Sequence, residues 1–418
     1  MNLTRPLLGQ ASAALAQLLD FSGPADEVLS RFFREHRSLG RQDRAFIAES
    51  VFAVLRRKRS LGAASGSQEP RALLVAALVR VLGFSGRSLE GLLKPDEFAL
   101  VSKAKAFRLE GQPPAVRADL PDWLWARLAA EHGDDEATRI AQAMLNPAPL
   151  DLRVNLARTG RDEMVARLAA DGLPGEPTPY SPAGIRLPGK PAINRHPAFL
   201  EGLVEVQDEG SQLLAWLLAP RRGEMVADYC AGAGGKTLAI AMLMRGSGRL
   251  YAMDISGRRL AALAPRAARA GVTSIHPVTL SGDNDPRVKR LAGKMDRVLV
   301  DAPCSGFGTL RRNPDLKWRH TPAAVEELAQ KQARILKAAA RLVKPGGRLV
   351  YATCSLLQQE NDAIADSFSA ASPEFAPLSC ADLLRGQRIT LESGDRLRLL
   401  PHRHGTDGFF AAAFERRG

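Results

Sequence analysis

The sequence predicts an α/β protein whose C-terminal half forms a doubly wound parallel sheet, and two observations carry this prediction. From about residue 205, short apolar runs typical of strands alternate with runs in which apolar residues recur every three or four positions, as they do in helices. A glycine-rich turn over 231–237 also joins the first of these strands to the next helix. Strict alternation of strands and helices favours parallel strands joined by crossover helices.

Two further domains are expected before this sheet. Residues 1–140 show only helical spacing of apolar residues, which predicts an all-helical domain, and a single helix is expected over 123–145. Pro147 and Pro149 then open a region with one strand-like segment, one helical segment and a stretch rich in Pro and Gly. It predicts a small α+β module over 145–204, which leaves 205–418 for the parallel sheet. A length of 418 residues accommodates three domains.

Composition and charge narrow the class of protein and its partners. Hydrophobic residues make up 45% and charged residues 25%, which excludes a largely disordered chain. The 58 Lys and Arg against 45 Asp and Glu give a net charge of +13, which favours a polyanionic partner such as nucleic acid. Within 31–59, nine basic residues face three acidic ones, and this excess indicates a phosphate-binding surface.

Membrane and metal partners are not expected. No apolar run approaches about 18 residues and no signal-peptide core precedes the first helix, so we expect a cytoplasmic protein. The four cysteines lie too far apart in sequence for a Cys-x-x-Cys metal pair, and they are too few for a disulfide framework. Any chemistry they perform is therefore expected to be that of single thiols.

The glycine-rich turn predicts a nucleoside ligand. Glycines let the backbone approach a ligand closely, the following helix start offers free N–H groups, and Asp254 at the end of the next strand suits ribose hydroxyls. The run Gly-Lys-Thr at 235–237 also resembles the end of a P-loop, but that motif needs a glycine where Cys230 stands. An adenosyl ligand is therefore favoured, and a P-loop-like ATPase is kept as an alternative.

Two cysteines follow two predicted strands in the same way. Cys304 and Cys354 each stand just past the carboxyl end of a strand, and a serine follows each of them. Ligands of open α/β sheets bind at that edge, so two thiols at equivalent strand ends indicate a reactive site. From the residues alone, Cys230 and Cys380 are interpreted as small buried side chains.

Methylation of cytosine at C5 is a reaction that uses these groups. C5 is a poor nucleophile, but a thiolate that adds to C6 makes C5 enamine-like and able to attack an electrophilic methyl group. A carboxylic acid near N3 stabilises the adduct, and Asp301 beside Cys304 suits that task. A second thiol can assist when the C5 proton and the first thiol leave. The pattern does not decide which cysteine attacks.

These motifs resemble the Sun (Fmu/Nop) family of RNA cytosine-5 methyltransferases. The resemblance covers about 205–418 through the segments 206–211 (VQDEGS), 228–237 (DYCAGAGGKT), 301–306 (DAPCSG), 311–318 (RRNPDLKW), 351–355 (YATCS) and 404–410 (HGTDGFF). Parts of 33–57 resemble the NusB-like helical RNA-binding domain of the bacterial rRNA branch. The resemblance implies a Rossmann-like class I methyltransferase sheet behind a NusB-like domain. It also implies S-adenosylmethionine as cofactor and RNA as substrate, with 16S rRNA preferred over tRNA.

The resemblance also implies roles for single residues. Cys354 becomes the nucleophile, Cys304 assists product release, and Asp301 serves both the base and the cofactor. The implied cofactor-binding residues are Cys230, Ala231, Gly232, Ala233, Gly234, Gly235, Lys236, Asp254, Asp283 and Asp301. Without the resemblance, Lys236 could be a solvated lysine at a helix start and Asp283 an exposed acid in a turn.

One departure from the family pattern affects the cofactor loop. The family usually has Ala-Ala-Pro-Gly-Gly-Lys, whereas this chain has Gly232 and Ala233 at the second and third positions. We therefore expect a looser loop and a lower cofactor affinity. A second hypothesis, from another class, is an RNA-binding assembly factor with a vestigial methyltransferase fold, and labelled methyl transfer discriminates between the two.

Overall fold

The computed structural model describes residues 3–418, which form two compact units. Unit 1 combines the chain up to Pro147 with the segment Thr309–Pro322, and unit 2 contains Ala148–Gly308 and Ala323–Gly418. The chain thus leaves unit 2 after Gly308, contributes a short segment to unit 1 and returns. No pattern in the sequence indicates this exchange.

Unit 1 is built from helices, as the apolar spacing predicts. They are α1 (Arg5–Leu19), α2 (Ala25–Glu35), α3 (Arg41–Arg56), α4 (Lys58–Ser65), α5 (Pro70–Arg80), α6 (Pro95–Ala106), α7 (Pro114–Arg117), α8 (Asp122–His132), α9 (Asp134–Met144) and α17 (Leu316–Arg319). The consecutive residues 73–78 of α5 are all fully buried, so this helix runs through the core of the unit. Gly133, with a φ of 78°, separates α8 from α9, so the single helix predicted over 123–145 is two helices.

The segment 309–322 is held inside unit 1 by buried polar contacts. The indole Nε1 of Trp318 donates to the carbonyl of Leu55 over 2.7 Å, and the ammonium of Lys317 donates to the carbonyl of Arg56 over 2.8 Å. The guanidinium of Arg56 in turn donates to the carbonyl of Arg311 over 3.0 Å. Burial lowers the pKa of Lys317 to about 7. Lys317 therefore acts as a structural residue of unit 1.

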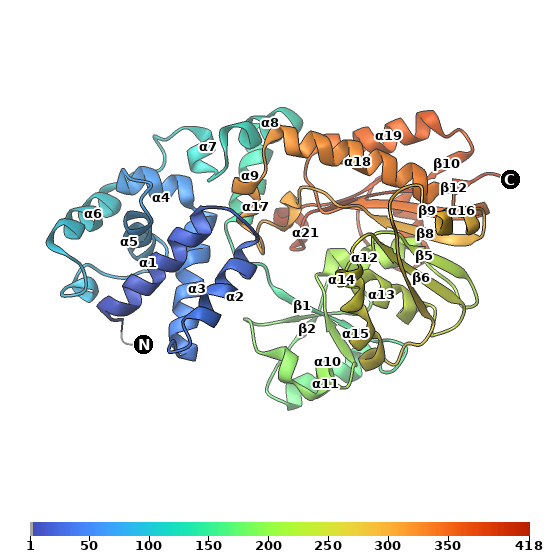
Figure 1. The fold of residues 1–418 in the computed structure, drawn as a ribbon, viewed down its shortest axis with the longest axis horizontal. Coiled ribbons are helices and arrows are strands. Elements are labelled where there is room, and N and C mark those ends of the chain that lie inside the picture. The colour runs from blue at the N-terminus through green and yellow to red at the C-terminus, as the bar shows by residue number, and fades with distance from the viewer. Residues whose placement is uncertain (1–2) are drawn as a thin grey trace. The chain divides into compact units, whose positions relative to one another are not determined.

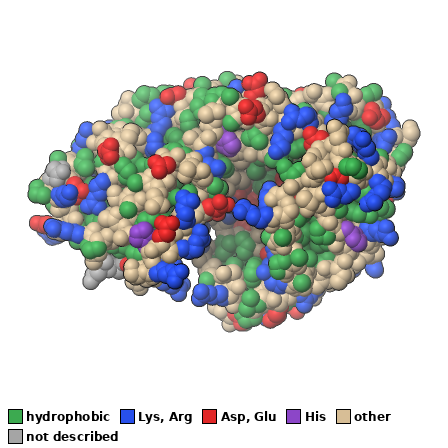
Figure 2. All heavy atoms as spheres, in the orientation of Figure 1, with side chains coloured by type: hydrophobic (Ala, Val, Ile, Leu, Met, Phe, Trp, Pro, Cys, Tyr) green, Lys and Arg blue, Asp and Glu red, His purple; other side chains and the backbone are tan. Residues whose placement is uncertain are grey.

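These contacts correct part of the predicted phosphate-binding surface. Arg56 is buried, and burial lowers the pKa of its guanidinium to about 10, with a smaller contribution from Arg57. Arg57 and Arg59 donate to main-chain carbonyls of the same unit. The prediction is therefore wrong for Arg56. The exposed basic residues of the stretch are Arg31, Arg34, Arg37 and Arg41. Figure 2 shows Lys and Arg interspersed with acidic side chains over the visible face.

Unit 2 begins with a small antiparallel sheet. Its strands are β1 (Leu150–Val154), β2 (Glu176–Pro177), β3 (Gly184–Leu187) and β4 (Val204–Val206), in the order β2-β3-β1-β4. Two helices accompany them, α10 (Arg161–Ala170) and α11 (Pro197–Leu200). Leu152, Leu168, Ile185 and Val204 form the centre of the core that this sheet shares with them.

The larger sheet of unit 2 confirms the predicted α/β class. Its strands are β5 (Met225–Asp228), β6 (Arg249–Asp254), β7 (Ile275–Thr279), β8 (Met295–Asp301), β9 (Val343–Thr353), β10 (Phe375–Leu378), β11 (Leu397–Leu399) and β12 (Phe409–Arg416). The order is β10-β12-β9-β8-β5-β6-β7, and β11 pairs with β12. Neighbours from β9 to β7 are parallel, whereas β12 runs antiparallel between β9 and β10.

Helices cover both faces of this sheet. The helices of the region are α12 (Glu209–Leu218), α13 (Gly235–Leu243), α14 (Gly257–Ala261), α15 (Leu263–Ala270), α16 (Pro286–Arg290), α18 (Pro322–Ala340), α19 (Asp362–Ala371), α20 (Cys380–Gly386) and α21 (Pro401–His404). Val298 and Val300 of β8 pack in a core with residues of α18 and α19, while Leu299 between them packs with α12 and α13. Figure 1 shows these helix pairs on opposite sides of the strands.

Two features are absent from residues 3–418. No helix there combines the length and the apolar character needed to cross a membrane. No three or more His, Cys, Asp or Glu side chains of this part of the chain are grouped so as to hold a metal ion.

Candidate active site

Four neighbouring strands bring the predicted site residues to one edge of the sheet. The predicted residues Asp254 and Asp301 end β6 and β8, and Cys354 follows the end of β9 directly. Asp228, which is not among the predicted site residues, ends β5 at the same edge. The register pairs Asp301 with Ala352, two residues before Cys354. Because these strands are parallel neighbours, their carboxyl ends meet at the edge where α/β proteins bind ligands.

The turn after β5 depends on two glycines and on Asp254. Gly232 and Gly234 have φ values of 55° and 85°, in the left-handed region that favours glycine. A Cβ atom on Gly234 would lie 2.2 Å from Cδ1 of Leu263, so a side chain there would collide with α15. The amide of Gly232 donates to Oδ2 of Asp254 over 2.8 Å, and the amide of Ser256 donates to Oδ1 over 2.7 Å. Asp254 therefore fixes the turn as well as facing the ligand edge.

Two arginines brace the same turn from outside it. Arg266 donates to the carbonyl of Ala233 over 2.5 Å, and Arg153 of β1 donates to the carbonyl of Gly235 over 2.8 Å. Arg153 is buried, so the small antiparallel sheet supports the glycine-rich turn directly. Sequence reasoning missed both residues because a lone arginine outside a motif carries no signal of its target.

The side chain of Lys236 is largely buried and contacts two other residues of unit 2. Its ammonium lies 2.8 Å from Oδ2 of Asp301 and 5.5 Å from the ring centroid of Phe409. Burial alone would lower its pKa, but the charge and hydrogen bond of Asp301, with a further contribution from Cys354, raise it above the ordinary value. The alternative interpretation of Lys236 as a solvated lysine is wrong, since its side chain is only 14% exposed.

The edge carries an excess of negative charge. Asp228 is fully buried, its Oδ2 accepts from the hydroxyl of Thr237 over 2.7 Å, and its Oδ1 has no hydrogen-bond partner within residues 3–418. Burial raises the pKa of Asp228 to about 7. Burial and the charges of Asp301, Asp228 and Asp254 raise the pKa of the Cys230 thiol. The carboxylates of Asp254 and Asp301 and the free Oδ1 of Asp228 offer acceptors to a ligand that carries cationic or hydroxyl groups.

The two predicted cysteines are in contact. Their Sγ atoms lie 3.4 Å apart. The hydrogen bond to Cys354 and burial raise the pKa of Cys304 well above the ordinary value. The amide of Gly308 donates to the carbonyl of Cys354 over 2.8 Å, and a Cβ atom on Gly308 would lie 2.1 Å from the carbonyl of Gly408. A close backbone packing thus holds the Cys354 segment against the segment that follows Cys304.

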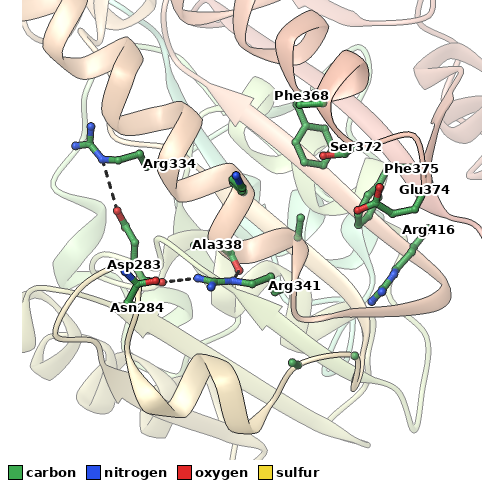
Figure 3. Close-up of a pocket in the computed structure, with 15 residues that line it drawn as sticks. Asp283, Asn284, Arg334, Ala338, Arg341, Phe368, Ser372, Glu374, Phe375 and Arg416 are labelled. Carbon is green, nitrogen blue, oxygen red and sulfur yellow. Dashed lines mark hydrogen bonds and ion pairs between the residues drawn. The ribbon is translucent and has the colours of Figure 1, made fainter.

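Asp283 has different surroundings. Its carboxylate lies 3.7 Å from Nε of Arg334, and its main-chain carbonyl accepts from Arg341 over 2.6 Å. It lines a cavity of about 750 Å³ that Figure 3 shows between α18 and the segments around Phe368 and Arg416. Neither the glycine turn nor the cysteines line that cavity. A cofactor role for Asp283 stays a prediction.

Comparisons with known proteins match both the C-terminal part and the middle part of the chain to rRNA methyltransferases. A family model described as 16S rRNA methyltransferase RsmB/F matches residues 215–415, and one described as an RsmF/B-like methyltransferase ferredoxin-like domain matches residues 120–194. A probable ribosomal RNA small subunit methyltransferase B from Synechocystis sp. is 35% identical over 93% of this chain and 94% of its own. The ribosomal RNA small subunit methyltransferase B of Sodalis glossinidius is 32% identical over 96% of each chain.

Solved structures show the same fold. The protein PH0851 superposes over the full length of both chains with a TM-score of 0.81 and 25% identity. A methyltransferase homologue from Pyrococcus horikoshii covers 72% of this chain and 97% of its own, with a TM-score of 0.62 and 31% identity.

Proposed function

Because the chain belongs to the RsmB/F family of 16S rRNA methyltransferases, we propose that it methylates C5 of a cytosine in small-subunit rRNA. In this proposal, S-adenosylmethionine is the methyl donor and Cys354 forms a transient bond to C6 of the base. The family membership confirms the resemblance to the Sun family and sets aside the P-loop-like ATPase.

The contact between the two thiols carries the proposal. A single catalytic cysteine needs no second thiol within 3.4 Å, and two structural cysteines need no place beside Asp301 at the ligand edge. Methylation at C5 requires two steps at sulfur: a thiolate must first add to C6, and the same thiolate must later be eliminated. A pair of touching thiols serves both steps.

The steps follow from the chemistry of these side chains. The Cys354 thiolate adds to C6, and the electron pair of the C5–C6 double bond moves into the ring. Asp301, in its acid form for this step, donates a hydrogen bond to N3 as the ring gains electron density. When bound, S-adenosylmethionine supplies an electrophilic methyl group, which C5 takes. A water molecule then takes the C5 proton, and the C5–H electron pair re-forms the C5–C6 double bond. The C6–S bond breaks, its electron pair returns to the Cys354 sulfur, and the Cys304 thiol donates a hydrogen bond to the departing thiolate.

One electrostatic observation supports Cys354 as the nucleophile. The charge of Cys354 contributes to the raised pKa of Lys236, so the Lys236 ammonium is close enough to stabilise a Cys354 thiolate. The hydrogen bond between the thiols also raises the pKa of Cys304, so when one of the two sulfurs ionises the other stays protonated and can donate to it.

The residues at the edge fit the proposed cofactor. S-adenosylmethionine carries a sulfonium and an ammonium, and the unpaired Oδ1 of the buried Asp228 offers an acceptor for a cationic group. Asp254 stands where ribose hydroxyls are bound in this class of sheet. The turn 231–235 supplies the main-chain groups between them.

Transfer of a labelled methyl group tests the proposal. The protein is incubated with S-adenosylmethionine that carries a labelled methyl group and, separately, with deproteinised small-subunit rRNA, small ribosomal subunits and tRNA, and digested nucleosides are identified by mass spectrometry. We expect labelled 5-methylcytidine from small-subunit rRNA, and none from the Cys354→Ala protein. Label at another atom contradicts the proposal, while RNA binding without any transfer favours the vestigial assembly factor.

A further inference from the structure

The serines that follow the two cysteines share one buried carboxylate. The hydroxyls of Ser305 and Ser355 lie 3.2 Å apart, and each lies 2.5 Å from Oε2 of Glu360. Glu360 and Ser305 are fully buried, and Ser355 is almost so. One carboxylate oxygen therefore joins the residue after Cys304 to the residue after Cys354.

The other oxygen of Glu360 extends the same connection. Its Oε1 accepts from the amide of Ser305 over 2.8 Å and from Nε2 of Gln332 over 2.9 Å. The same Gln332 nitrogen donates to the carbonyl of Pro303 over 3.0 Å, on the other side of Cys304. The residues that flank Cys304 are thus both tied to one glutamate, directly or through one glutamine.

The free-energy cost of burying the Glu360 carboxylate is high for a residue whose role is stability alone. Glutamate is almost never fully buried unless it is paired, and none of these four donors carries a charge. The hydrogen bonds compensate for the loss of hydration, but replacing a buried polar network by apolar side chains is often neutral or stabilising. The network therefore has to be explained by the geometry that it fixes.

We infer that Glu360 is a positioning residue that holds the two cysteine segments in register, so that the sulfurs stay in contact through attack and release. The catalytic part of this inference rests on the proposed function, whereas the thiol geometry does not. The position of Glu360 is itself fixed, because the hydroxyl of the buried Tyr351 donates to its main-chain carbonyl over 2.5 Å. Asn361 next to it donates to the carbonyl of Ser355 over 3.1 Å.

The charge of Glu360 supports the same role. Behind the hydrogen bond to Cys354 and burial, it contributes to the raised pKa of Cys304. Removing this charge should therefore make Cys304 ionise at lower pH. The pH at which Cys304 ionises depends on the distance between the Glu360 carboxylate and the Cys304 thiol. A residue that only stabilised the fold would not change this pH.

The test replaces Glu360 by the amide of equal size. In Glu360→Gln, an NH₂ group replaces one carboxylate oxygen. This group is a donor, so it faces the hydroxyl or amide donors that the oxygen accepted from, and those hydrogen bonds are lost. Diamide oxidises two neighbouring thiols to a disulfide and is itself reduced to the hydrazine, so its rate of joining Cys304 to Cys354 reports their approach. We expect the alkylation profile of Cys304 to shift to lower pH, and the diamide rate, divided by the rate of Cys304 alkylation at the same pH, to fall by about tenfold. This ratio removes the effect of thiol ionisation on the oxidation rate. The matched control is Glu327→Gln, an exposed carboxyl on α18, which should leave both measurements unchanged.

Folding is monitored within the same experiment. Cys380 is fully buried elsewhere in unit 2, so it should resist alkylation in every folded variant. If Glu360→Gln exposes Cys380, the double variant Ser305→Ala with Ser355→Ala replaces it, since this removes two donors and keeps the carboxylate. Slower joining of Cys304 to Cys354 in that folded variant supports the inference, and joining at the wild-type rate overturns it.

Methyl transfer completes the test. Because a displacement of about 1 Å can cost about 100-fold in rate, we expect kcat of Glu360→Gln to fall by about that factor with KM for RNA within about twofold. Folded Glu360→Gln that joins its thiols and turns over at wild-type rates overturns the inference. If wild-type protein forms the Cys304–Cys354 disulfide but never methylates cytosine, the proposed function is wrong. The rates of disulfide formation in the variants then still test the positioning role of Glu360.

Discussion

The ammonium of Lys236 lies 2.8 Å from the carboxylate of Asp301, which joins the glycine-rich turn to the strand that leads to Cys304. The charge of Cys354 contributes to the raised pKa of Lys236, so the same ammonium also interacts with Cys354. One cation therefore serves both the cofactor turn and the proposed nucleophile.

The first prediction concerns this cation. Lys236→Met keeps much of the side-chain length but leaves Asp301 without its partner and a Cys354 thiolate without a nearby positive charge. We expect kcat for methyl transfer to fall by about 100-fold or more, the range seen when one preorganised electrostatic group is removed from an active site. Turnover at saturating RNA and cofactor measures it. Lys236→Arg should recover part of the loss, and Lys236→Met within about twofold of wild type would contradict this role.

The second prediction concerns the departure from the family loop. Ala233→Pro restores the usual proline, and it keeps the carbonyl that accepts from Arg266. A proline in a compatible turn stabilises by about 0.4–1 kcal/mol because it restricts the unfolded chain. We therefore expect a higher melting temperature and a lower Kd for S-adenosylmethionine by calorimetry. Gly234→Ala should do the opposite, because its Cβ would meet Leu263. Weaker binding by Ala233→Pro would refute the idea of a loosened loop.

The third prediction uses the buried carboxyl of Asp228. Burial raises its pKa from 3.8 to about 7, so between these values the folded protein holds a proton that the unfolded chain has lost. Its contribution to stability therefore falls as pH rises through that window. Asp228→Asn has no such titration and should melt above wild type at about pH 8, with a free energy of unfolding higher by up to about 4 kcal/mol from the pKa difference between 3.8 and about 7. The gap should narrow toward about pH 5, and a gap that widens on acidification would contradict the assignment.

The sequence was sufficient to predict which strand ends meet at the candidate site. Alternating strands and helices with a glycine turn are local patterns, and the rule that ligands meet the carboxyl ends of parallel strands places Asp254, Asp301, Cys304 and Cys354 at one edge. The strand ends in the structure agree with this. The antiparallel insertion of β12 has no such local signature, since strand order depends on contacts between distant segments.

Other features were beyond the sequence for a different reason. Glu360 receives donors 28 and 55 residues away in the chain, so no spacing rule reveals it. The basic run that ends at Arg59 looked like a phosphate-binding surface, yet Arg56 is buried against the segment 309–322. Charge patterns report composition, whereas burial depends on which distant segment packs against the charge.

Trapping of the RNA adduct in Cys304→Ala tests the central claim most directly. The protein is incubated with small-subunit rRNA and S-adenosylmethionine and then run on a denaturing gel, beside Cys354→Ala and the double variant. If Cys354 attacks C6 and Cys304 assists its departure, Cys304→Ala alone should retain a covalent RNA–protein species. The absence of that species from Cys304→Ala, or its persistence in the double variant, would contradict the account.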